Sequence, residues 1–168
     1  KQSSYDNHLK RLLIIASASY YETIFAELFR NYINGISKDG KILEPLIERT
    51  FITLKYHTWF EWDKDNANRF FSYFGSDFKV WIKDEIKKNS IIDSYISSFL
   101  EIGLERNKIA HQNYSSYTIE KTIKEVYDQY KNGLLFINWF DMMLKKYDLC
   151  NRNDVIMKLC VDTFIEYY

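Results

Sequence analysis

The spacing of apolar residues along this 168-residue chain predicts helices almost throughout. Apolar side chains recur every three to four residues, which is the period of an amphipathic helix and not that of a strand. The chain contains one proline and five glycines, too few for the many tight turns of a β-rich protein. We therefore expect an all-α fold with no internal repeat.

The first predicted helix runs from about Tyr5 to Ile33 and ends before Asn34-Gly35, a typical stop signal. A second helix, with Pro45 in its first turn, covers about 44–56, and a short one covers about 65–73. The apolar positions of the first helix include Leu9, Leu12, Leu13, Ala16, Tyr20, Ile24, Phe25, Leu28, Tyr32 and Ile33.

Hydroxyl side chains at three positions can cap further helices, and Asp93 stands three residues after one of them, as in a capping box. We expect a single domain over residues 1–168, with its core at about 5–146 and an extra C-terminal helix. The predicted ranges are 76–88 from Ser76, 90–111 from Ser90, 118–146 from Thr118, and 153–167 for the last helix.

Composition narrows the partners that this chain is expected to bind. Lys and Arg total 23, as do Asp and Glu, and a net charge of zero argues against a broad basic field that grips nucleic acid non-specifically. It leaves room for a small phosphate site and favours self-association. Aromatic residues make up 18% of the chain; we expect them in the core, with a self-association surface as the alternative. For the four tryptophans, Trp59, Trp62, Trp81 and Trp139, the alternative to the core is a base-stacking platform.

The sequence gives no indication of a metal, a cofactor or a membrane span. Cys150 and Cys160 lack the spacing of zinc ligands, and there are only three histidines. No stretch approaches about 18 uninterrupted apolar residues, and the residues at the start of the chain lack the apolar core of a signal peptide. We expect reduced cysteines, a cytoplasmic protein, and no cofactor.

One six-residue segment, Arg106-Asn107-Lys108-Ile109-Ala110-His111, has chemical potential beyond packing. Its arginine is a permanent cation with a planar donor fork that suits phosphate. Its histidine can take or give a proton near neutral pH. Together these two side chains could cleave an RNA phosphodiester without a metal.

The helical period places Arg106 where an apolar residue is expected. At about 100° per residue, Arg106 continues the stripe of Ile92 and Phe99, while Asn107 and His111 share one edge of it. A charge in such a stripe is costly unless it is paired or opens into a cleft. Two interpretations remain: Arg106 caps the helix or pairs with a carboxylate such as Glu22, or it serves a functional cleft.

The segment Arg106–His111, at the end of a helix in a small all-α domain, resembles the Arg-x4–6-His motif of the HEPN superfamily. The segment Ile15-Ala16-Ser17-Ala18-Ser19-Tyr20-Tyr21-Glu22-Thr23-Ile24-Phe25 is similar to the first helix of the RiboL-PSP-type and related HEPN branches. The segment Arg69-Phe70-Phe71-Ser72-Tyr73-Phe74-Gly75 is also similar to that branch. The resemblance covers about residues 5 to 146.

The resemblance implies a bundle of four to five helices that dimerises, so that the motifs of two copies meet in one cleft. It also implies metal-independent RNA cleavage by attack of the ribose 2′-hydroxyl. His111 would be the general acid or base, Arg106 would hold the phosphate, and Asn107 would orient one of them. Glu22, which could orient Arg106, and Tyr114 are weaker supporting candidates.

Three functions follow as hypotheses from these observations. The first is a HEPN-type endoribonuclease, a toxin or phage-defence effector with an antitoxin or a larger defence system as partner. The second is a non-catalytic HEPN module that binds RNA, a nucleotide or a protein, and the third is a helical interaction domain in which the motif is a coincidence. Lys83, Lys87, Lys88 and Lys108 could form a modest basic rim for RNA, with solvated surface as the alternative.

Overall fold

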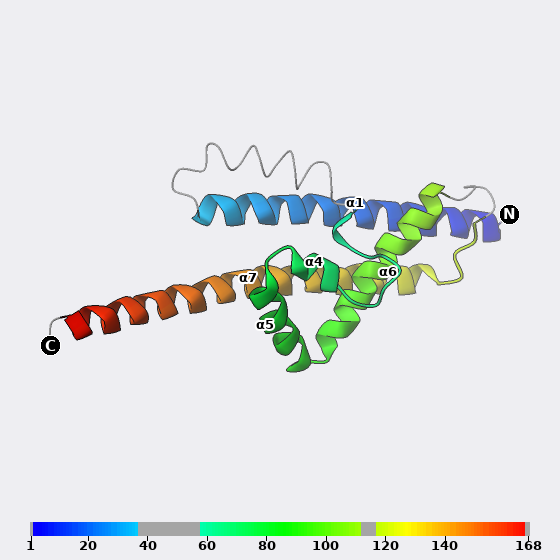
Figure 1. The fold of residues 1–168 in the computed structure, drawn as a ribbon. Helices are drawn as coiled ribbons and strands as arrows, with labels where there is room; N and C mark the ends of the chain where they lie inside the picture. Colours follow the sequence, from blue (N-terminus) through cyan, green and yellow to red (C-terminus); the bar gives the residue numbers. More distant parts are fainter. Residues whose placement is uncertain (1, 37–57, 112–116, 167–168) are drawn as a thin grey trace. The chain divides into compact units, whose positions relative to one another are not determined.

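The computed structural model describes residues 2–36, 58–111 and 117–166, with side chains at 5–35, 58–111 and 117–150. All regular structure in these ranges is helical, which confirms the predicted all-α class. The predicted helix at 44–56, with Pro45, lies outside the described residues. The helices are α1 (Gln2–Ile36), α4 (Asn68–Ser72), α5 (Ser76–Lys87), α6 (Ile91–His111) and α7 (Ile123–Glu166) (Figure 1).

The internal contacts of the chain divide it into two compact units, residues 1–137 and residues 138–168. The first unit contains α1, α4, α5, α6 and the part of α7 up to residue 137. The second unit contains the rest of α7. The segment Arg106–His111 belongs to the first unit.

Three helices, α5, α6 and α7, begin differently from the sequence prediction. Gly75, not Ser76, is the N-cap of α5, and its φ of 97° lies in the left-handed region that favours glycine. Ser76 is the first helical residue, and its hydroxyl donates to Asp77 Oδ1 at 3.1 Å. At the start of α6 the Oδ1 of Asn89 accepts the N–H of Ile91 at 3.4 Å, so Asn89 takes the capping role that was predicted for Ser90.

The cap of α7 is Thr122, four residues after the predicted cap at Thr118. Thr122 and Glu125 form a reciprocal capping box, in which the N–H of Thr122 donates to Glu125 Oε2 at 2.7 Å and the N–H of Glu125 donates to Thr122 Oγ1 at 3.2 Å. Helix α7 then continues past the predicted end near Lys146 to Glu166. No glycine or proline occurs between 147 and 152 to stop it.

The core of the first unit is an aromatic cluster centred on Phe25 of α1, which is fully buried. The aromatic residues in this unit therefore pack chiefly against one another, as the default prediction had it. Trp59, at the start of the second described range, is 1% exposed and belongs to this core. Among the described residues, the rings whose centroids lie within 6.3 Å of that of Phe25 include Phe29, Trp59, Phe60, Phe70, Phe99 and Phe136.

Tyr21 joins α1 to α7 through a close contact with the helix backbone. Its hydroxyl donates to the carbonyl of Tyr130 at 2.8 Å, and its ring stacks on that of Tyr130 at 5.9 Å. The approach is possible because residue 133 is glycine, since a Cβ there would overlap the Tyr21 hydroxyl. The sequence segment that resembles the HEPN first helix thus supplies a main link between two helices of the bundle.

Only part of the apolar surface of α1 is buried. Phe25, Leu28 and Ile33 face the core, whereas Leu9, Leu12 and Tyr20 are 36%, 48% and 49% exposed. Over Tyr5–Gly35 the helix is long and apolar enough to cross a membrane, and 39% of its most apolar window is buried inside the protein. Core helices of soluble proteins and N-terminal signal sequences pass the same test, so the absence of a membrane span stays a prediction.

Candidate functional site

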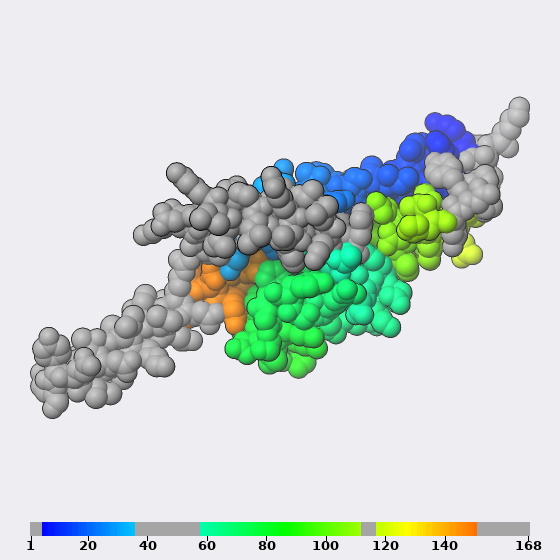
Figure 2. Space-filling view, turned by 45° about the horizontal axis from the view of Figure 1, so that its top comes forward, coloured from blue at the N-terminus to red at the C-terminus, as the bar shows by residue number. Residues whose placement is uncertain are grey.

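Helix α6, which carries Arg106 and His111, is buried along most of its length and exposed at its C-terminal end. Ile92, Ile96 and Phe99 are at most 3% exposed, as the apolar stripe predicts. Leu100, Ile102 and Ile109 are also buried, because α6 is covered on a wider sector than one stripe. Ala110 lies five helical turns after Ile92, on the same stripe of α6. It is nevertheless exposed, since the last turn of α6 reaches the surface between α1 and the segment that begins at residue 58 (Figure 2).

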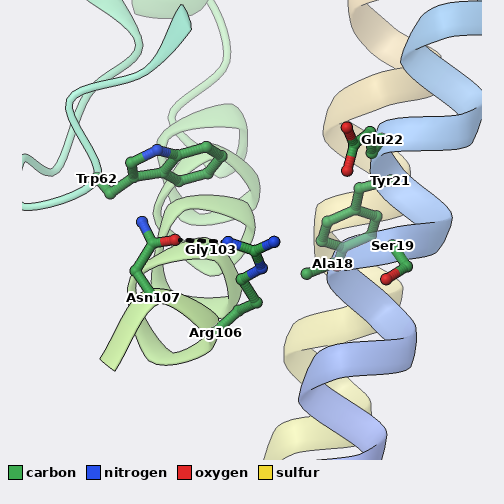
Figure 3. Close-up of a pocket in the computed structure, with 8 residues that line it drawn as sticks. All are labelled: Ala18, Ser19, Tyr21, Glu22, Trp62, Gly103, Arg106 and Asn107. Atoms are coloured by element: carbon green, nitrogen blue, oxygen red, sulfur yellow. Dashed lines mark hydrogen bonds between the residues drawn. The ribbon is translucent and has the colours of Figure 1, made fainter. Parts of the chain in front are cut away.

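Arg106 lies at the boundary between the buried part of α6 and its exposed end. It is half-buried and lines a narrow pocket between α1 and α6, with room on the order of one water molecule. Figure 3 shows the guanidinium pointing across the pocket toward α1. The pocket is lined by Ala18, Ser19, Tyr21, Glu22, Trp62, Gly103, Arg106 and Asn107.

The hydrogen bonding of Arg106 leaves most of its donors available. Its Nη1 donates to Oδ1 of Asn107 at 3.2 Å, and this is its one hydrogen bond or ion pair among the described residues. Glu22 lines the same pocket, but it forms no ion pair with Arg106. The pairing of Arg106 with Glu22, one of the two sequence interpretations, is therefore not present in this structure.

His111 lies apart from this pocket. It is the last residue of α6, its side chain is exposed, and it makes no hydrogen bond to another described residue. Five residues along a helix correspond to about 7.5 Å of rise and about 140° of rotation, so Arg106 and His111 of one chain leave α6 in different directions. The structure thus brings Arg106, Asn107 and Glu22 together and keeps His111 outside; Tyr114 lies outside the described residues.

The lysines of the predicted basic rim are mostly paired locally. Lys87, Lys88 and Lys108 each form an ion pair with an acidic residue three positions earlier, at 2.6 to 2.9 Å. Lys83, on α5, is half-buried. Exposed pairs of this kind contribute little to stability, and they lower the positive field that RNA would meet.

A short segment after α6 ties the end of that helix to α1. The backbone carbonyl of Tyr117 accepts hydrogen bonds from Asn7 and Arg11, and the carbonyl of Ile119 accepts one from Lys10 at 2.9 Å. The Tyr117 hydroxyl donates to Glu105, the residue before Arg106. Burial, and after it this hydrogen bond, raise the pKa of Tyr117 well above its usual range, so the phenol stays neutral.

Five of the pocket residues were not predicted as site residues from the sequence: Ala18, Ser19, Tyr21, Trp62 and Gly103. Trp62 was assigned to the core, yet its half-buried indole lines the pocket and lies directly over Gly103. A Cβ at position 103 would overlap the six-membered ring of Trp62. Arg106 and Asn107 follow Gly103 by three and four residues. This helical spacing could have indicated that the three residues share one face of α6.

The part of the chain that the structure describes contains no group of three or more His, Cys, Asp or Glu side chains that could hold a metal ion. The pocket itself presents the guanidinium of Arg106, the amide of Asn107 and the indole of Trp62, with the carboxylate of Glu22 and the hydroxyl of Ser19 on the α1 side. Such a set can bind an anion through Arg106 and offer an aromatic face beside it.

Comparison with known families gives a match over most of the chain. The model of the RiboL-PSP-HEPN family matches residues 1–146, which includes all of α1, α4, α5 and α6. The corresponding comparisons with curated proteins and with solved structures find no match.

Proposed function

The chain belongs to the RiboL-PSP-HEPN family, and from this premise we propose that it is an endoribonuclease whose site combines Arg106, Asn107 and His111 across two copies. The observation that carries the proposal is the state of Arg106. It is a half-buried cation that donates to a neutral amide and to no carboxylate among the described residues. Its remaining donors suit the two free oxygens of a phosphodiester.

The proposed reaction uses the substrate's own hydroxyl as nucleophile. The 2′-oxygen forms a bond to the adjacent phosphorus, and the bond from phosphorus to the 5′-oxygen of the next nucleotide breaks. His111 takes the proton from the 2′-hydroxyl and returns it to the departing 5′-oxygen. Arg106 stabilises the charge that develops on the phosphoryl oxygens, and Asn107 holds the guanidinium in position. The products are a 2′,3′-cyclic phosphate and a 5′-hydroxyl.

The separation of Arg106 from His111 within one chain is the reason for proposing a site shared by two copies. About 140° of rotation along α6 keeps both side chains of one copy from contacting the same phosphate. A two-fold axis near the exposed end of α6 would bring His111 of the second copy toward Arg106 of the first. The half-buried Arg106 of one copy and the exposed His111 of the other would then lie in one cleft.

The exposed apolar stripe of α1 supports the same arrangement. Tyr5, Leu9, Leu12 and Tyr20 are 67%, 36%, 48% and 49% exposed, and their spacing puts them on one face of the helix. Ser19 lies on that face and also lines the Arg106 pocket. A second copy that covers this stripe would remove apolar surface from water at the edge of the site.

A non-catalytic HEPN module that binds RNA, a nucleotide or a protein is the second candidate. The exposed position of His111, away from the pocket, is the observation that favours it. In that case Arg106 would bind a phosphate without cleaving it.

One assay separates these functions. The purified protein is incubated with a fluorescent single-stranded oligoribonucleotide in excess chelator, and the products are identified by mass spectrometry. We expect cyclic phosphate products, lost in both Arg106→Ala and His111→Ala and retained in His8→Ala, an exposed histidine on α1. Equal cleavage by all the proteins would contradict the proposal, and binding without cleavage would favour the non-catalytic module.

A further inference from the structure

Trp62 is held in a fixed position at the rim of the Arg106 pocket. Its ring centroid lies 5.0 Å from that of Phe60 and 5.9 Å from that of Phe99, both buried core residues. The six-membered ring rests on the backbone of α6 at Gly103, which has no side chain to displace it. The indole therefore needs little additional ordering when a ligand arrives.

The indole and the guanidinium are neighbours on one face of α6. Gly103, against which the indole lies, precedes Arg106 by three residues and Asn107 by four, which is about one helical turn. Figure 3 shows Trp62 above the guanidinium, with the Asn107 side chain on the same side. An aromatic surface about one turn from an arginine corresponds to the separation of a nucleobase from a neighbouring phosphate.

The pocket is large enough for only a small part of a nucleotide, so a base would have to bind outside it. Room on the order of one water molecule can take a phosphate oxygen but not a base. Trp62 is intermediate in burial and lines the pocket, so a planar ring would stack on the part of the indole that reaches solvent at the pocket mouth. A base can stack there only when it is free of a duplex, because paired bases are already stacked on each other.

We propose that Trp62 is a base-stacking residue of this site, which takes one nucleobase of unpaired RNA while Arg106 holds an adjacent phosphate. The inference rests on the proposed RNA function but does not depend on catalysis. Stacking tolerates any base because each has a planar face, so selectivity would be for single-stranded over double-stranded RNA. Gly103 is then a positioning residue, since its missing side chain lets the indole lie beside Arg106.

The test measures binding apart from cleavage. Fluorescence anisotropy is followed with a single-stranded oligoribonucleotide whose 2′-hydroxyls are methylated, so that the proposed attack cannot occur. We expect Trp62→Leu to weaken binding by about 5- to 150-fold and Trp62→Phe by much less. Trp81→Leu is the matched control, because Trp81 is also half-buried but lies on α5 against Phe78 and does not line the pocket.

A series of oligonucleotides with one base removed at each position in turn makes the test independent of any variant's folding. With the unaltered protein, removing one particular base should weaken binding about as much as Trp62→Leu does, and Trp62→Leu should be insensitive to that removal. The proposal is overturned if no single base matters, if Trp62→Leu binds like the unaltered protein, or if the protein binds no RNA. Binding with this pattern but without cleavage of unmethylated RNA would contradict the proposed catalysis and leave the stacking role intact.

Discussion

Arg106 donates a hydrogen bond from Nη1 to Oδ1 of Asn107 at 3.2 Å, so the cation of the pocket is held by its own neighbour and through a neutral acceptor. A carboxylate in the same place would neutralise the guanidinium. The identity of residue 107 therefore bears directly on whether Arg106 can bind an anion.

Asn107→Asp should weaken RNA binding more than Asn107→Ala does. The aspartate would pair with Arg106 and would repel the phosphate, with an expected loss of about 10- to 100-fold in affinity. Removing the amide costs only the hydrogen bond that positions the guanidinium. Anisotropy measurements on both variants check this, with Asn31→Asp, an exposed asparagine of α1, as the control for the added charge. Equal losses in the two Asn107 variants would contradict the electrostatic explanation.

Mixing two inactive variants should restore cleavage if the site is shared between copies. In a dimer of one Arg106→Ala chain and one His111→Ala chain, one of the two shared sites would keep an intact arginine and an intact histidine. Random exchange of subunits would then give about a quarter of the unaltered activity. The measurement is the cleavage rate of the equimolar mixture against each variant alone. No recovery, with exchange verified by labelled subunits, would show that each chain uses its own two residues.

Leu12→Glu should disrupt the proposed dimer. Leu12 is 48% exposed in the middle of the α1 stripe, and a charge there would have to be buried when a second copy covers the stripe. We expect sedimentation to show a dimer for the unaltered chain and a monomer for Leu12→Glu at the same concentration. Val80→Glu, at a 64% exposed position on α5, should stay dimeric. A monomer in all three cases would contradict the shared site.

The sequence pattern predicted the helices well where the helical periodicity is strong. Helix α1 was expected at 5–33 and occupies Gln2–Ile36, so the predicted stop at Asn34-Gly35 was wrong, whereas α6 ends at His111 as expected. The sequence pattern failed to predict the helix caps, because several polar residues near the start of a helix can each act as its cap. For α7 the cap is Thr122, three residues before Glu125, and not the predicted Thr118. The pattern also predicted a break between helices at 118–146 and 153–167, whereas α7 continues through this region, since no residue incompatible with a helix is present there.

The candidate site was only partly predictable for a different reason. Arg106 could be recognised because one charged residue interrupts an apolar stripe on its own helix. Trp62 could not, because its place in the pocket depends on Gly103, 41 positions away, and local periodicity carries no information about such a contact. The exposure of Ala110 had a similar cause, since it depends on where neighbouring segments stop covering α6.

Gly133→Ala should destabilise the bundle although alanine favours helices. The added Cβ would overlap the Tyr21 hydroxyl and would lie 2.6 Å from its Cζ, so that α1 and α7 must move apart or Tyr21 must leave its place. Overpacking of this kind costs about 1–3 kcal/mol. Gly35→Ala is the matched control, because no atom lies within 4 Å of a Cβ there and the change should be neutral or slightly stabilising. Thermal unfolding of both variants checks the difference; equal stability would mean that the Tyr21 contact is not needed.

Tyr21 should make the protein lose stability at high pH. Burial, and after it the neighbouring phenol of Tyr130, raise the pKa of Tyr21 well above its usual range, so the folded protein keeps this proton. In the unfolded chain the phenol ionises near its ordinary pKa of about 10. Above that pH the unfolded state binds fewer protons than the folded state, so the free energy of unfolding falls as pH rises, by up to about 1.4 kcal/mol per pH unit for one group. The contribution is complete below about pH 10 and is lost progressively above it.

The Tyr21→Phe variant isolates this effect. It lacks the hydrogen bond to the Tyr130 carbonyl and should be less stable by about 0.5–1.5 kcal/mol near neutral pH. Its stability should also fall less steeply than that of the unaltered protein between about pH 10 and pH 11, because one titrating phenol has been removed. Chemical denaturation at several pH values measures both quantities. Tyr20→Phe, at an exposed position beside it on α1, is the control and should keep the steeper dependence. An equal slope in Tyr21→Phe and the unaltered protein would show that other phenols account for the alkaline loss, with Tyr117 the first to test, since burial raises its pKa too.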